Sequence, residues 1–183
     1  GYPVVLKVVS AEIIHKSDVG GVVLNINSEE MFRRGYQNLT RNIQAAYPHI
    51  KQPLVLIQKM MPVTTELVVG ALRDRLFGPV VMFGLGGIYV EALKLVNFRL
   101  LPIGIEDAGD LIRRTLPPPL LKGIRGRAPI HVDALASVMV SLGRLLEEQP
   151  QVEEVDLNPI LPCEDGCVAV DARIIINSGV GER

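Results

Sequence analysis

The chain has 183 residues, 48% of them hydrophobic, and its 19 basic and 20 acidic side chains give a net charge of −1. This length and hydrophobic content predict a globular chain of one domain or two small lobes and exclude a disordered one. The balanced charge, the lack of tryptophan and the 4% aromatic content argue against a nucleic-acid surface or a membrane surface. No apolar run reaches the roughly 18 residues of a membrane span, and residue 1 onward lacks a secretion signal, so we expect a cytoplasmic protein.

The apolar run 4–9 predicts a first strand, in which Lys7 is the polar side chain. A lysine in a mostly buried strand must reach an anion or extend its head to water, and both alternatives stay open here. A polar loop follows, with His15 and Lys16 ahead of Gly20 and Gly21. Lysine and glycine amides suit a polyphosphate, and a histidine can carry a proton or attack phosphorus. A solvated loop is the alternative interpretation.

A helix is predicted to begin after Ser28, a favourable N-cap. Apolar residues then recur at spacings of three and four and predict one buried face, made of Phe32, Tyr36, Leu39, Ile43 and Ala46. The Lys-Gln-Pro stretch 51–53 is the predicted boundary between two lobes, 1–53 and 54–183. The apolar run 54–60 is therefore assigned to the second lobe.

The run 80–83 predicts a short strand that leads into three glycines, Gly84, Gly86 and Gly87. Glycines let a ligand approach the backbone, and their N–H groups can hold an anion, although this spacing is not the dinucleotide-binding fingerprint. A strand with Glu66 at its start precedes this run, and the short loop between them predicts an antiparallel pair.

The remaining elements are expected to be a strand at 98–103, helices at 106–116 and 134–148, and strands at 152–157 and 167–176. The predicted fold class is therefore α/β (α+β), with a mixed or antiparallel sheet and packed helices.

Asp171 is the acidic residue inside the last predicted strand, and Asn158 follows the strand before it. If the two strands pair through the turn 164–166, Asn158 and Asp171 come close together. A carboxylate and an amide oxygen form a hard oxygen site that suits Mg²⁺, which takes its other ligands from water and phosphate. An ion pair between Asp171 and Arg173 is the structural alternative.

Three segments, 6–22, 70–87 and 156–173, together resemble the ATP-grasp domain of NDP-forming acyl-CoA synthetases. This family contains the ADP-forming acetyl-CoA synthetases and relatives of the succinyl-CoA synthetase β subunit. The resemblance runs from about residue 1 to about residue 177 and keeps the order of the motifs. It implies a two-lobed ATP-grasp fold. It also implies that a further segment of roughly 50 residues precedes the matched region, so the first part of the small lobe is expected to be missing here.

The resemblance also implies roles for individual residues. It implies a nucleotide site with Lys7 at the phosphates, Gly20 and Gly21 in the phosphate-covering loop, Gln58, Lys59 and Met60 at the adenine, and Glu66 near the ribose. It implies Mg²⁺ ligands at Asn158 and Asp171. It implies that His15 is a transient phosphoryl carrier and that Lys7 and Glu91 are catalytic. It implies that Gly84, Gly86, Gly87 and Glu91 receive the partner's phosphohistidine loop.

The implied reaction is acyl-CoA + ADP + phosphate ⇌ acid + CoA + ATP, in which this chain moves a phosphoryl group between phosphohistidine and Mg-bound ADP or ATP. The implied partner is a CoA-binding α subunit or domain of the same enzyme. The alternative is a regulatory ATP-grasp-like module of a protein acetyltransferase, which binds a ligand without phosphoryl transfer. The joint presence of His15, Asn158 and Asp171 favours the catalytic interpretation.

Overall fold

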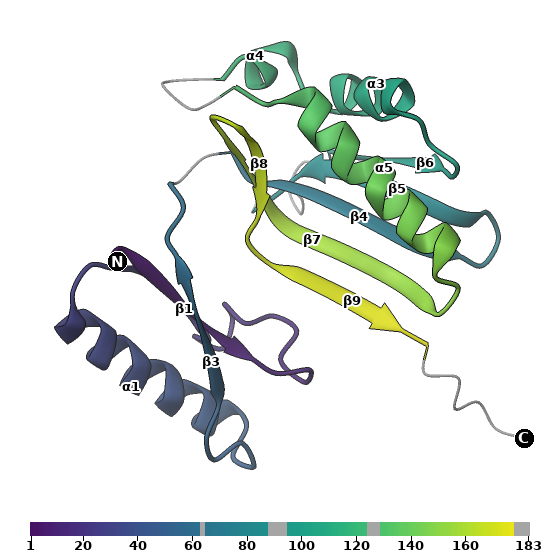
Figure 1. The fold of residues 1–183 in the computed structure, drawn as a ribbon. Coiled ribbons are helices and arrows are strands. Elements are labelled where there is room, and N and C mark those ends of the chain that lie inside the picture. The colour runs from purple at the N-terminus through teal and green to yellow at the C-terminus, as the bar shows by residue number, and fades with distance from the viewer. Residues whose placement is uncertain (63–64, 88–94, 124–128, 178–183) are drawn as a thin grey trace, which may run out of the picture. The chain divides into compact units, whose positions relative to one another are not determined.

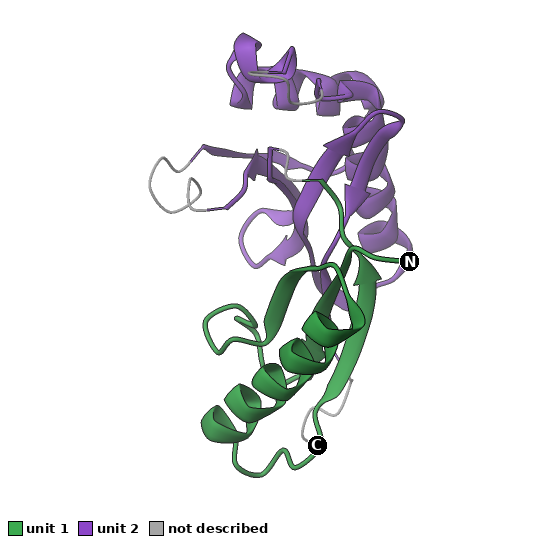
Figure 2. Cartoon of the chain, turned by 90° about the vertical axis from the view of Figure 1, so that its left-hand side faces the viewer, with its two compact units in different colours: residues 1–63 green, residues 64–183 purple. Residues whose placement is uncertain are grey.

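The computed structural model describes residues 1–62, 65–87, 95–123 and 129–177. The chain divides into two compact units, Gly1–Val63 and Thr64–Arg183, which Figure 2 shows in different colours. Among the helices within the described residues, none is both long enough and apolar enough to cross a membrane.

The first unit is an antiparallel sheet with one helix packed on one face (Figure 1). Its strands lie in the order β2-β1-β3, with β1 at Val4–Val9, β2 at Val22–Ile26 and β3 at Leu54–Lys59. Helix α1 spans Glu29–Ala46. The core of this unit consists of buried residues from β1, β2, α1 and the loop after β1: Leu6, Val8, Ile13, Ile26, Leu39 and Ile43.

Strand β3 belongs to the first unit, because it pairs with β1 from Val4↔Lys59 to Val9↔Leu54. The assignment of the run 54–60 to the second lobe is therefore wrong, and the division falls after Val63 rather than after residue 53. The Lys-Gln-Pro stretch is a connection that returns the chain to its own sheet. A local breaker signal cannot show which strand will supply the hydrogen bonds of the next one.

Helix α1 begins where it was predicted, because the Ser28 side chain accepts a hydrogen bond from the Met31 N–H at 3.2 Å. Its buried face is rotated from the predicted one: Tyr36 is 42% exposed and Ala46 is exposed. Gly35 is buried instead, and a methyl group there would lie 3.2 Å from Val23 Cγ1. The glycine lets the helix backbone approach the sheet closely, which turns Tyr36 outward.

The second unit is an antiparallel sheet in the order β6-β5-β4-β7-β8, with β9 also paired to β7. The strands are β4 (Leu67–Asp74), β5 (Gly78–Leu85), β6 (Val96–Leu100), β7 (Val152–Cys163), β8 (Gly166–Ala169) and β9 (Ala172–Ile176). The helices are α3 (Ile105–Thr115), α4 (Pro118–Leu121) and α5 (Val132–Glu148). Figure 1 shows α3 and α5 on one face of the sheet. The core lies between these helices and the sheet and includes Leu67, Val69, Phe83, Ile112, Met139 and Leu146.

Most predicted elements of this unit are confirmed with shifted ends. Strand β6 ends at Leu100, short of the predicted residue 103, because its partner β5 begins at Gly78 and the Leu101 N–H already donates to the Pro79 carbonyl near that start. The predicted strand 167–176 is wrong as one element, since the long strand β7 pairs with two shorter strands in succession. The regular strand is interrupted between β8 and β9, at Val170 and Asp171, which still bond to β7 through their backbones.

The hairpin between β4 and β5 is held firmly at its turn. The Asp74 carboxylate accepts from the N–H groups of Leu76 at 2.8 Å and Phe77 at 2.9 Å, and these hydrogen bonds lower the pKa of Asp74. Gly78 completes the turn with a φ of +80°. Next to this turn, the Arg73 guanidinium donates to backbone carbonyls at the end of α5, in the connection that follows and at the start of β7. This end of the sheet is therefore closed by polar contacts.

Candidate functional site

Lys7 and Gln58 lie on the same face of the first unit's sheet. Lys7 is opposite Leu56, and Val5 is opposite Gln58, so all four residues share one face. Helix α1 packs on the other face, against Leu6 and Val8. Lys59 is opposite Val4, one residue beyond Gln58 at the end of β3. The structure thus brings two of the predicted nucleotide residues, Lys7 and Gln58, together on one face of this sheet.

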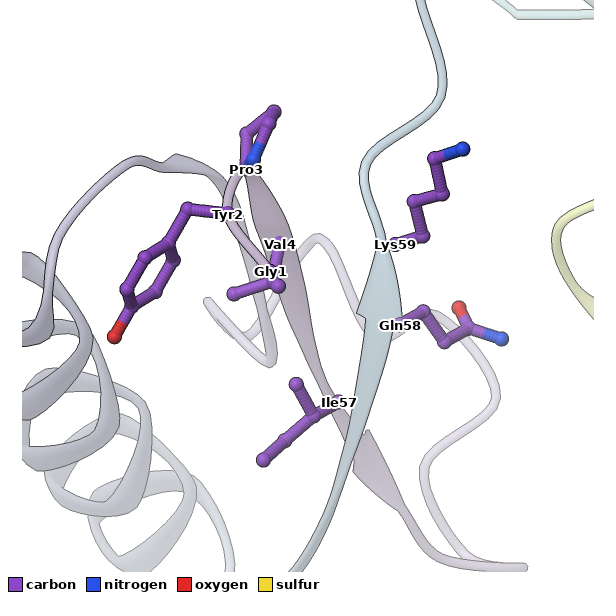
Figure 3. A pocket seen from close by; sticks show the side chains of 7 residues that line it. All are labelled: Gly1, Tyr2, Pro3, Val4, Ile57, Gln58 and Lys59. Carbon is purple, nitrogen blue, oxygen red and sulfur yellow. The ribbon is translucent and has the colours of Figure 1, made fainter.

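A hollow of about 550 Å³ lies beside this strand edge, within the first unit. Figure 3 shows the Tyr2 ring directed toward the helix and the Gln58 amide directed away from it. The Met60 N–H donates to the Pro3 carbonyl at 3.0 Å and joins the end of β3 to the start of β1. The hollow is lined by Gly1, Tyr2, Pro3, Val4, Ile57, Gln58 and Lys59. The predicted adenine residues Gln58 and Lys59 therefore border an open hollow on the surface of this unit.

His15 lies on an exposed turn whose two ends are fixed. Ile13, two residues earlier, is buried in the core of the first unit. The His15 carbonyl accepts from the Asp18 N–H at 3.2 Å, and Gly21 returns the chain to the sheet through the Val8 N–H at 2.8 Å. Glu12 on the same loop contacts His49 at 2.8 Å. The imidazole is therefore presented to solvent by a loop that is anchored on both sides.

Gly20 and Gly21 are explained by packing and by the turn itself. Gly20 has a φ of +63°, and a methyl group there would lie 2.4 Å from Asn42 Nδ2. A methyl group at Gly21 would lie 2.6 Å from Val8 Cγ1. The Gly20 N–H donates to the Ser17 carbonyl at 3.1 Å and the Gly21 N–H to the Lys16 carbonyl at 2.7 Å. Both amides that the sequence offers to a phosphate are engaged within the loop in this conformation.

Asn158 and Asp171 come together at the junction of three strands. The Asn158 N–H donates to the Asp171 carbonyl at 3.2 Å, and the Val170 N–H donates to the Pro159 carbonyl at 3.1 Å. The proximity predicted from the hairpin is confirmed. The predicted strand position of Asp171 is wrong, because it lies in the gap between β8 and β9. There its Oδ1 accepts from the Ala172 N–H at 3.0 Å.

Asp156 joins this group, although the sequence did not single it out. It is opposite Arg173 in the β7–β9 pairing, one pair away from Leu157↔Ala172. Burial raises the pKa of Asp156, the charges of Glu154 and Asp171 raise it further, and Arg173 opposes them. Arg173, offered from the sequence as the partner of Asp171, thus lies opposite Asp156. Asp156 and Asn158 are two residues apart on one strand, so their side chains point to the same face of the sheet. This spacing is the signal that could have revealed the Asp156 carboxylate.

Asp156→Asn is expected to raise the melting temperature at pH 7 in EDTA without nucleotide. The folded-state pKa lies above the unfolded value near 3.8, so the folded chain binds more protons at intermediate pH. The unfavourable contribution of the ionised carboxylate therefore grows as the pH rises through the folded-state pKa. The stabilisation by Asp156→Asn should shrink as the pH falls toward 3.8. The exposed Asp165→Asn is the control, and equal shifts in both variants would contradict the prediction.

Glu66 lies against the glycine turn that follows β5. The Gly86 N–H donates to the Glu66 carbonyl at 2.7 Å. A methyl group at Gly87 would lie 2.7 Å from Glu66 Oε2, and Gly87 has a φ of +65°. Leu67, the next residue, pairs with Leu85 on one side and with Ile160 on the other. Glu66 and the turn therefore lie at the same end of the sheet as Asn158.

The glycine run has structural reasons in addition to any ligand. A methyl group at Gly84 would lie 2.4 Å from Val96 Cγ1, and one at Gly86 would lie 3.0 Å from the Glu66 backbone. The Leu85 N–H donates to the Leu95 carbonyl at 3.0 Å, and the Gly86 N–H is engaged by Glu66. Among the described residues of this turn, the amides of Leu85 and Gly86 are therefore already engaged and are not offered to an anion. Glu91, predicted to act beside it, lies outside the described residues.

The donor set at the sheet end fits Mg²⁺ bound with a nucleotide. Asn158 supplies an amide oxygen and Asp171 a carboxylate, and the backbone hydrogen bond between them holds the two residues adjacent. Mg²⁺ prefers such hard oxygen ligands and completes its octahedron with water and phosphate oxygens. Within the part of the chain that the structure describes, no three or more His, Cys, Asp or Glu side chains are placed to hold a metal without such additional ligands.

Comparison with protein families matches residues 1–176 to the ATP-grasp domain. The β subunit of an ADP-forming acetate–CoA ligase from Pyrococcus furiosus is 48% identical over 176 residues, which cover 96% of this chain and 76% of that subunit. A longer ADP-forming acetate–CoA ligase from Archaeoglobus fulgidus is 42% identical. The chain spans 26% of this longer relative.

Solved structures agree with these relatives. An acetyl-coenzyme A synthetase from Ca. Korarchaeum cryptofilum, in complex with coenzyme A and Ca-AMPCP, is 41% identical with a TM-score of 0.86. The match covers 96% of this chain and 77% of that one. A second structure of the same enzyme contains Mg-AMPPCP, with a phosphohistidine segment pointing towards the nucleotide-binding site, and has a TM-score of 0.79.

Proposed function

This chain belongs to the ATP-grasp family and to the nucleotide-binding β component of ADP-forming acetate–CoA ligases, and from this premise we propose its part in the reaction. It transfers a phosphoryl group between a phosphohistidine and ADP or ATP. The observation that carries the proposal is the adjacency of Asn158 and Asp171, which the sequence separates by a whole hairpin. The matched relatives are ligases, so the alternative of a regulatory acetyltransferase module has no support here.

Each contact with the nucleotide is assigned to named residues in this proposal. Lys7 neutralises phosphate charge, Gln58, Lys59 and Met60 border the base, and Glu66 accepts from the ribose. Gly20 and Gly21 allow the phosphate-covering loop to return closely against α1. Mg²⁺ held by Asn158 and Asp171 would neutralise phosphate oxygens and orient them for transfer. Asp156 supports this group from the adjoining position on β7.

His15 is the phosphoryl carrier of the proposed mechanism. A neutral imidazole nitrogen forms a bond to phosphorus while the bond from phosphorus to the bridging oxygen of ATP breaks, and ADP leaves with the charge on its terminal oxygen. Such transfers depend on positioning and charge neutralisation, which Lys7 supplies from this chain. The exposed turn that carries His15 supports this role, because the ring must meet two different donors and acceptors in succession.

The partner is a CoA-binding α subunit or domain that carries its own phosphohistidine. The turn with Gly84, Gly86 and Gly87, together with Glu91, is the part of this chain proposed to face that segment. The relatives that match are either β subunits or longer single chains, which supports a partner in either form. Acyl-CoA formation therefore belongs to the complete enzyme.

The test is a thermal shift of the complete enzyme with ADP and Mg²⁺. A ligand at 100 times its Kd adds about 2.7 kcal/mol, which corresponds to a rise of roughly 5–10 °C for a chain of this size. EDTA should remove most of this rise, because the phosphate charge is then unneutralised. Asp171→Ala should do the same, whereas Asp165→Ala on the nearby exposed turn should keep it. An unchanged melting temperature with nucleotide would disprove the assignment.

A further inference from the structure

We propose that Gly87 is a positioning residue for the Glu66 carboxylate and sets the preference of the site for a ribose over a deoxyribose. The inference rests on the proposed function, since Glu66 is there assigned to the nucleotide. It differs from the assignment of Gly87 to the partner's phosphohistidine loop, because it gives this glycine a role toward the nucleotide through a neighbouring side chain.

Gly87 lies directly beside the Glu66 carboxylate. A methyl group at Gly87 would lie 2.7 Å from Glu66 Oε2 and 3.5 Å from Glu66 Cδ. The distance of 2.7 Å is shorter than real contacts of a Cβ atom, so either the new methyl group or the carboxylate must move. The Glu66 side chain is exposed, so it can swing into solvent at little cost. The expected result of a methyl group is therefore a displaced carboxylate and not an unfolded turn.

The backbone of Glu66 is fixed by its neighbours. The Gly86 N–H donates to the Glu66 carbonyl at 2.7 Å, and Leu67 is paired on both sides, with Leu85 and Ile160. A methyl group at Gly86 would meet the Glu66 backbone at 3.0 Å. The two glycines thus act on different parts of one residue: Gly86 holds the backbone, and Gly87 leaves room for the carboxylate.

The position and charge of the Glu66 carboxylate restrict what it can bind. Glu66 lies at the sheet end where Asn158 precedes the Ile160 that pairs with Leu67. A carboxylate repels phosphate and accepts hydrogen bonds from hydroxyl groups. Of the parts of a nucleotide, the ribose offers two neighbouring hydroxyls to such an acceptor. A carboxylate that accepts from both hydroxyls discriminates against a sugar that lacks one of them, because an acceptor desolvated by the bound nucleotide is then left unpaired.

The experiment is a double-mutant cycle in the complete enzyme, with the Kd of ADP and of 2′-deoxyADP measured calorimetrically in Mg²⁺. The variants are Gly87→Ala, Glu66→Ala and the combination of both. Gly78→Ala is the matched control, because Gly78 has a φ of +80° and a methyl group added there would meet nothing within 4 Å. Both alanines carry the backbone strain of a positive φ, but at Gly87 the methyl group also meets Glu66.

We expect Gly87→Ala to weaken ADP binding roughly tenfold in the native background and less than about twofold when Glu66 is already alanine, as for residues that act through one contact. The Kd of 2′-deoxyADP divided by the Kd of ADP measures the preference for ribose. This ratio should fall by the same factor in Gly87→Ala and in Glu66→Ala, and it should fall no further in the double variant. Gly78→Ala should leave both Kd values and their ratio unchanged. Without nucleotide, the melting temperatures of Gly87→Ala and of its control Gly78→Ala should be similar.

An equal loss of affinity from Gly87→Ala in both backgrounds would overturn the inference, because the effect would then not pass through Glu66. So would an unchanged ratio of the two Kd values in Gly87→Ala. Either result with intact ADP binding by the native enzyme leaves the proposed function standing. Failure of the native enzyme to bind ADP would instead overturn the proposed function itself.

Discussion

The His15→Ala variant of the complete enzyme is expected to lose turnover by about three orders of magnitude or more, without a measurable change in melting temperature. Alanine has no nucleophile that could accept the phosphoryl group, and water cannot act as the carrier in its place. Removal of a covalent nucleophile lowers the turnover of other enzymes by at least this factor. The stability should not change, because the ring lies on an exposed turn. The turn is held by its own backbone hydrogen bonds and by buried Ile13.

The measurement combines steady-state turnover with labelling from γ-labelled ATP. A label on this chain that is stable in base and labile in acid should disappear in His15→Ala. His131→Ala is the matched control, since His131 is exposed and makes no side-chain cap at the start of α5. Turnover within a few fold of the native enzyme in His15→Ala would remove the carrier role and leave a direct transfer from the partner to ADP.

The Arg73→Met variant is expected to lose about 3 kcal/mol of unfolding free energy, which corresponds to roughly 6–12 °C in the melting temperature of a chain of this size. Arg73 Nε donates to the Val152 carbonyl at 2.9 Å, and Nη2 donates to the carbonyls of Leu146 and of Gln149, the latter at 3.2 Å. The last carbonyls of a helix have no partner within the helix. The guanidinium therefore joins β4, the end of α5 and the start of β7.

Methionine keeps the apolar stem of Arg73 and removes its hydrogen bonds, which isolates the polar contribution. Arg73→Lys should recover less than half of the loss, since one ammonium group cannot reach acceptors in three directions. Arg75→Met on the same hairpin is the control, because Arg75 is exposed and should change stability by less than about 0.5 kcal/mol. Denaturant unfolding would measure the differences, and equal losses at positions 73 and 75 would contradict the prediction.

The ATP-grasp fold and the adjacency of Asn158 and Asp171 could be predicted from the sequence, and both are confirmed. The adjacency was accessible because it depends on a tight turn between two neighbouring strands, which is a local feature. The break at Asp171 was not accessible, because it follows from the length of β7, which takes β8 and β9 as successive partners. The position of β3 was missed for a similar reason, since its partner β1 lies 45 or more residues earlier in every register pair.

The glycines show a second limit of reasoning from sequence. Gly20, Gly21 and Gly86 were considered as donors to an anion, but their N–H groups donate to carbonyls of the chain. A glycine in a sequence indicates either an exposed amide or a close neighbour, and the neighbour is known only from the structure. For Gly87 that neighbour is Glu66, which turns two separately predicted sites into adjacent parts of one sheet end.

The division into two units, each with its own hydrophobic core, bears on cooperativity. The core around Leu6 and Leu39 and the core around Phe83 and Leu146 are separate clusters, so heat need not disrupt them together. The first unit spans residues 1–63, a size at which a single core gives little margin of stability. A single two-state transition then does not describe the unfolding of the whole chain, although each unit can unfold in one step. Arg73 lies in the second unit, so the loss of stability in Arg73→Met should appear in the unfolding of that unit.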